Sequence, residues 1–145
     1  MTDDAERALD GWAKFLNPET LRSNLITAAM FLAAYEMLRT TVIDRVRIFH
    51  SHEFRDGEWI PSPEYQTRCL SRHTSPFRAS LLWFEELAAI TEADIAAIDE
   101  IRQHRNALAH DLPSFLITVD QSVRADLFIR VYEIVAKIDE VLKGS

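Results

Sequence analysis

The chain has 145 residues and a formal net charge of −7, with 48% apolar and 27% charged residues. This length and balance fit one soluble globular domain, residues 1–145, with its own hydrophobic core, and exclude a disordered chain. Three glycines are too few for the tight turns of a barrel or sandwich, and no GxGxxG or GxxxxGK[ST] phosphate loop is present.

The helical period of the apolar residues predicts the elements in chain order. We expect helices at about 3–16, 18–50, 76–90, 91–111 and 120–143, and a short one near 63–72. The helix over 18–50 is apolar on two faces, which is typical of the central helix of a bundle. We therefore predict an all-α fold, an up-and-down bundle of about five helices.

Capping residues support the predicted helix starts. A capping side chain precedes proline at Asn17-Pro18, Ser62-Pro63 and Ser75-Pro76. Thr91-Glu92-Ala93-Asp94 resembles a capping box with aspartate in the third place. Strand-like alternation persists nowhere, so we predict that the rest of the segment 51–75 is a long surface connection.

Charge and cysteine content bear on the binding partners and the cellular compartment of the protein. An acidic domain is repelled on average by nucleic acid, although a local basic patch can still bind it. A single cysteine, Cys69, suits a reducing compartment. The N-terminal residues lack the features of a signal peptide, and the apolar stretch 25–35 is too short to cross a bilayer. We expect a cytoplasmic protein without a membrane partner.

Arg105 stands inside an apolar arc of the helix predicted for 91–111. At 100° per residue this arc of about 80° contains Ile98, Ile101, Leu108 and Leu112. A guanidinium at this place is costly unless it meets an acid, a phosphate or a partner surface. An adjoining face carries Asp99, Arg102, Asn106 and His110. Asn106 and His110 are four residues apart, so their side chains can touch.

Arginine and histidine at one helix end suit the cleavage of RNA by its own 2′-hydroxyl. Arginine binds phosphate oxygens through a fixed fork, and histidine exchanges protons near neutral pH. His110 would move the proton, Arg105 would stabilise charge on the phosphorane, and this route needs no metal. In the structural alternative, Arg105 pairs with an acid such as Glu36, and His110 caps the helix C-terminus.

The segment Arg105-Asn106-Ala107-Leu108-Ala109-His110 resembles the signature of the HEPN family, an arginine, a common polar residue and a histidine just before a final helix. The resemblance is specific over 95–113 and loose elsewhere. It implies a helical bundle, a homodimer in which two motifs meet, and a metal-independent endoribonuclease acting on RNA in toxin–antitoxin, phage-defence or CRISPR systems. It further implies that Arg105 holds the scissile phosphate, that His110 is the general acid or base, and that Asn106 orients His110 or binds a phosphate oxygen.

Two alternatives stay open beside the enzyme. Some HEPN members are inactive, so the chain could be a non-catalytic dimeric module that binds a protein or nucleotide partner. The chain could also be an unrelated helical adaptor. In a toxin–antitoxin setting, the resemblance implies an antitoxin or a nucleotidyltransferase as partner.

Other candidate sites are weaker. His50, His52, Cys69 and His73 could bind zinc, but the close-spaced cysteine pairs of structural zinc sites are missing, so we expect no metal and no cofactor. Trp59 lies in the predicted connection, where it could stack on a base or pack over the bundle.

Overall fold

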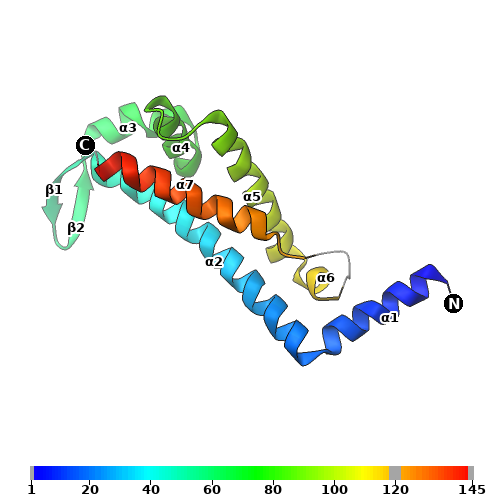
Figure 1. Ribbon diagram of the computed structural model, residues 1–145. Coiled ribbons are helices and arrows are strands. Elements are labelled where there is room, and N and C mark those ends of the chain that lie inside the picture. The colour runs from blue at the N-terminus through cyan, green and yellow to red at the C-terminus, as the bar shows by residue number, and fades with distance from the viewer. Residues whose placement is uncertain (1, 118–121, 144–145) are drawn as a thin grey trace.

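The computed structural model describes residues 2–117 and 122–143 (Figure 1). In chain order the elements are α1 (Asp3–Leu16), α2 (Pro18–Phe49), β1 (Ser51–Arg55), β2 (Glu58–Pro61), α3 (Pro63–Arg68), a 3₁₀ turn (Leu70–Arg72), α4 (Pro76–Glu86), α5 (Glu92–His110), α6 (Leu112–Ile117) and α7 (Ala125–Lys143). The predicted helical character is therefore confirmed.

Helix α2 is the central element. It begins at Asn17, whose side-chain oxygen accepts the backbone N–H groups of Glu19 and Thr20, both at 3.1 Å. Helices α4, α5 and α7 pack on α2. Figure 1 shows α7 running beside α2, and α1 extending at an angle from the N-terminal end of α2. The largest fully buried side chains of α2 are Phe31, Leu38, Val42 and Val46.

By length and composition alone, α2 could cross a membrane, and it is the one helix in the described part of the chain that could. A core helix of a water-soluble protein meets the same two criteria. A signal sequence near the N-terminus meets them too. Phe31 and Leu38 of α2 are fully buried, whereas 28% of the candidate span is buried as a whole.

The segment 51–61 forms an antiparallel hairpin, so the prediction that it lacks strands was wrong. Asp56 and Gly57 form its turn, both with positive φ (54° and 82°), as a type I′ turn requires. The hairpin is largely exposed on both faces, which explains why no buried–exposed alternation appears in its sequence. Asp-Gly was the signal that could have revealed it.

Two predicted helix boundaries were also wrong, and one helix was not predicted. Helix α4 ends at Glu86 rather than at 90, because Ala88 adopts φ 60° and the N–H groups of Ala88 and Ala89 close the helix onto Glu85 and Phe84. Glycine usually takes this position, so alanine gave no warning. Helix α6 was not predicted. Helix α7 begins at Ala125; residues 122–124 are not helical, and residues 120 and 121 lie outside the described residues.

Candidate functional site

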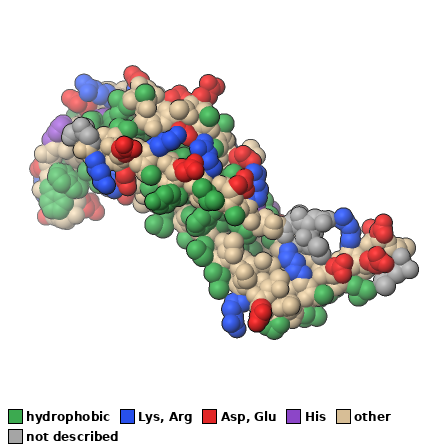
Figure 2. Space-filling model, in the orientation of Figure 1, with side chains coloured by type: hydrophobic (Ala, Val, Ile, Leu, Met, Phe, Trp, Pro, Cys, Tyr) green, Lys and Arg blue, Asp and Glu red, His purple; other side chains and the backbone are tan. Residues whose placement is uncertain are grey.

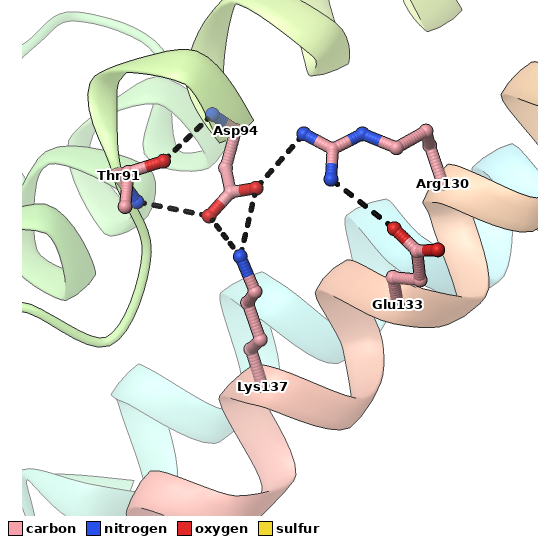
Figure 3. Close-up of polar contacts among 5 residues, drawn as sticks. All are labelled: Thr91, Asp94, Arg130, Glu133 and Lys137. Atoms are coloured by element: carbon pink, nitrogen blue, oxygen red, sulfur yellow. Dashed lines mark hydrogen bonds and ion pairs between the residues drawn. The ribbon is translucent and has the colours of Figure 1, made fainter.

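The first turn of α5 is anchored to α7 through Asp94 (Figure 3). Thr91 Oγ1 accepts the Asp94 N–H at 3.1 Å and Asp94 Oδ2 accepts the Thr91 N–H at 2.9 Å, which confirms the capping box. The same carboxylate, only 1% exposed, accepts hydrogen bonds from Lys137 Nζ at 2.8 Å and Arg130 Nη2 at 2.9 Å. These contacts fix α5 against α7.

The pKa of Asp94 reports the strength of this anchor. Burial alone would raise the pKa, but the hydrogen bonds from Lys137 and Thr91 outweigh burial and hold it at about 2. Asp94 therefore stays charged at physiological pH, so this part of α5 is held rigidly.

The other end of α5 stops abruptly at His110. The N–H of Asp111 still bonds to the carbonyl of Ala107 at 2.9 Å, after which the chain turns into α6. Ser114 Oγ donates to Asp111 Oδ2 at 2.6 Å and stabilises this turn. His110 is exposed at this helix end.

His104 is a structural histidine. Its ring packs edge-on against Phe31 and Phe115, with centroids 4.9 Å and 5.7 Å away, and its Nε2 accepts the Arg124 N–H at 3.1 Å. Burial lowers the pKa of His104. A neutral imidazole that already accepts a backbone hydrogen bond is poorly placed for proton transfer.

Arg105 is held by three groups of the chain. Its Nη2 lies 3.2 Å from Glu36 Oε1, its Nη1 donates to Asn106 Oδ1 at 3.1 Å, and its Cζ lies 5.5 Å from the centre of the Tyr35 ring. The acid considered as a structural alternative, Glu36, is thus a partner of Arg105. The Arg105 side chain is 34% exposed, so the cost of burial expected from its apolar arc is largely avoided.

Arg105, Asn106, Ala109 and His110 line one shallow depression of about 280 Å³ that is open to solvent. The three residues predicted to be catalytic therefore share one surface of α5. Asn106 orients Arg105, and within residues 2–117 and 122–143 no hydrogen bond joins it to His110. An arginine has five N–H donors, so Arg105 retains donors for a phosphate oxygen.

Sequence reasoning missed Tyr35, which lies near this surface. The pKa of Tyr35 is raised, because the effect of burial outweighs the opposing charges of Arg102 and Arg105. Tyr35 is 70 residues away from Arg105, a separation that helical periodicity cannot bridge. Arg102, which the helical period places on one face with Asn106 and His110, also lies near this surface.

The four candidate zinc ligands do not form a site. Cys69 is buried with its Sγ 3.8 Å from Ser80 Oγ, and burial raises its thiol pKa. His50 is also buried, whereas His52 and His73 are exposed. Across the described residues, no three His, Cys, Asp or Glu side chains are grouped so that they could hold a metal ion.

Trp59 packs on the hairpin rather than over the bundle. Its ring lies edge-on to Phe54 with centroids 5.2 Å apart, and both side chains stay exposed.

No protein-family model, curated protein or solved structure matches the chain.

Proposed function

We propose that this protein is a metal-independent endoribonuclease of the HEPN type. The observation that carries the proposal is the depression that Arg105 and His110 line together at the end of α5. Glu36 and Asn106 hold the guanidinium in a fixed orientation, as a catalytic arginine requires.

The chemistry follows from the two side chains. A base removes the proton of the substrate's 2′-hydroxyl, whose oxygen attacks the adjacent phosphorus. The bond from phosphorus to the 5′-oxygen then breaks, and that oxygen takes a proton from an acid. Arg105 stabilises the charge on the phosphorane, and His110 serves as base or acid. The products are a 2′,3′-cyclic phosphate and a 5′-hydroxyl.

A second copy of the chain completes the site in this proposal. One copy offers a single histidine in a depression open to solvent, whereas the reaction needs both a base and an acid and gains from the exclusion of water. A two-fold dimer that joins two such depressions would supply both, since each protomer contributes the same residues.

Exposed apolar side chains on three helices support such a dimer. Figure 2 shows hydrophobic side chains gathered over α2 and α7. The large exposed side chains include Leu9, Trp12 and Leu16 on α1, Ile26, Met30 and Met37 on α2, and Ile129 and Tyr132 on α7. Met37 follows Glu36, the partner of Arg105, in the sequence of α2.

A non-catalytic HEPN-like binding module is the second candidate. Glu36 already accepts a hydrogen bond from the Arg105 guanidinium. In addition, a chain of net charge −7 repels RNA on average. A module that dimerises and binds a protein or nucleotide partner would tolerate both features.

Kinetics of single variants test the enzyme. Wild-type protein, purified to homogeneity, should cleave single-stranded RNA with a metal chelator present. His110→Ala should slow cleavage about 10²–10⁴-fold, the usual contribution of a positioned acid or base. Arg105→Ala should also slow it strongly. His52→Ala, which removes another exposed histidine from β1, is the matched control and should cleave at the wild-type rate.

Equal rates for wild type, His110→Ala and His52→Ala would exclude this site. Absence of cleavage across varied RNAs would favour the binding module. A role in toxin–antitoxin or phage defence in the cytoplasm, with an antitoxin or nucleotidyltransferase partner, belongs to the same proposal. Expression should then arrest growth, and His110→Ala should relieve the arrest.

A further inference from the structure

A second pocket lies between α4 and α5, one helical turn from the candidate site. Its volume is about 310 Å³, at the small end of ligand pockets. Phe77 and Ile98, both nearly buried, form its floor, and most of its accessible lining is polar, with His73, Arg78 and Arg102 as hydrogen-bond donors. Convergent polar groups in a concave site fix the orientation of a ligand.

This pocket carries an excess of positive charge. Arg78 is neutralised by a bidentate pair with Asp99, with Nη1–Oδ1 at 2.8 Å and Nη2–Oδ2 at 3.3 Å. Arg102 is exposed and, in the part of the chain that the structure describes, forms no hydrogen bond or ion pair. Two guanidiniums face one carboxylate, which leaves a cationic pocket on an acidic protein.

His73 adds a directed donor to the pocket. Its Nδ1 accepts the backbone N–H of Ser75 at 2.9 Å. A neutral imidazole that accepts at Nδ1 carries its proton on Nε2, which is then a donor. His73 and Arg102 can therefore both donate to one anionic group.

We propose that this pocket binds one phosphate-bearing nucleotide of a single-stranded RNA. The phosphate contacts Arg102 and His73, and the sugar lies over Phe77. The inference rests on the proposed function, because it extends the path of the substrate. Arg102, Asn106 and His110 succeed one another on one face of α5, and Arg102 and His110 are separated by about 12 Å along the axis. The strand runs along this face from the pocket to the scissile phosphate.

Binding of an uncleavable strand tests the pocket apart from catalysis. The probe is a short, fluorescent, fully 2′-O-methylated RNA, and fluorescence anisotropy gives its Kd. Arg102→Ala should weaken binding about tenfold, because a charge-assisted hydrogen bond is lost. The slope of log K against log salt should become shallower by about 0.7, the value for one phosphate contact on a single strand. Arg102→Lys should retain most of the affinity.

Arg45→Ala is the matched control. Arg45 of α2 pairs with Asp139 of α7 at 3.1 Å, away from the pocket between α4 and α5, so this variant removes an equal charge elsewhere. We expect a change in Kd of less than about twofold, since distant charges are screened by salt. Equal weakening by Arg45→Ala and Arg102→Ala, or no weakening by either, would overturn the proposal.

The outcomes separate the pocket from the enzyme. Cleavage that depends on His110, with binding indifferent to Arg102, would overturn the pocket and leave the enzyme. Binding that depends on Arg102, without any cleavage, would support the pocket and remove the enzyme. A free nucleoside monophosphate that competes as strongly, on a molar basis, as an unlabelled strand would overturn the assignment to a strand.

Discussion

At the residue scale, Asp94 is a buried electrostatic anchor between α5 and α7. A pKa of about 2, against 3.8 for an unperturbed aspartate, corresponds to about 2 kcal/mol of stability. Asp94→Asn removes the charge that Lys137 and Arg130 contact. We expect the free energy of unfolding, measured with urea at pH 7, to fall by about 2 kcal/mol. Asp126→Asn, which breaks an exposed pair with Arg124, should have a much smaller effect.

The same aspartate predicts a pH dependence. Its pKa is lowered on folding, so its stabilisation is complete above about pH 4 and is lost as the pH falls towards about 2. The difference in unfolding free energy between wild type and Asp94→Asn should shrink over this window. A difference that stays constant from pH 7 to pH 2 would show that the Asp94 charge contributes nothing.

The contacts of single residues were predictable from the sequence where both partners are close in the chain. The Thr91–Asp94 capping box is such a case. Glu36 was considered as a partner of Arg105 only because a guanidinium in an apolar arc needs an acid. The contacts of Asp94 with Lys137 and Arg130 join residues 43 and 36 positions apart, and only the packing of α7 on α5 brings them together.

At the element scale, α1 depends on one glycine. Gly11 is buried against α6, and a Cβ at this position would overlap the carbonyl oxygen of Ile117. In an unconstrained helix, a Gly→Ala substitution stabilises the helix by roughly 0.5–1 kcal/mol. We expect Gly11→Ala to do the opposite and to weaken the packing of α1 on α6. Hydrogen exchange should become faster in α1 and stay unchanged in α5, and slower exchange throughout α1 would contradict this packing.

Elements were predictable where one face is buried or a cap is clear. Pro18, Pro63 and Pro76 begin helices as expected. The side chain of Ser62 does not cap its helix, because its hydroxyl donates to the His50 carbonyl at 2.7 Å instead. The hairpin was not predicted because both of its faces are exposed. The end of α4 was not predicted because Ala88 takes a conformation usual for glycine. The residues predicted to be catalytic fall on one surface because α5 is a regular helix over its whole length.

At the scale of the whole molecule, we expect a homodimer in solution. Met37 is 68% exposed and Tyr132 is 75% exposed, and large exposed apolar surfaces usually mark interfaces. Light scattering at micromolar concentration should give twice the mass of the chain. Met37→Glu should produce monomers and lower RNA cleavage. Phe54→Glu on the hairpin, where the side chain is 60% exposed, should leave the dimer intact. A monomeric wild-type protein would contradict this account.

The chemical identity of the cleaved ends tests the central claim most directly. Wild-type protein is incubated in a metal chelator with a single-stranded RNA, and the fragments are weighed by mass spectrometry. We predict 2′,3′-cyclic phosphate and 5′-hydroxyl ends, loss of these products with His110→Ala, and no cleavage at a position where the RNA carries a single 2′-deoxy sugar. Cleavage at that deoxy position, 5′-phosphate products, or fragments that persist with His110→Ala would contradict the claim that Arg105 and His110 cleave RNA through its own 2′-hydroxyl.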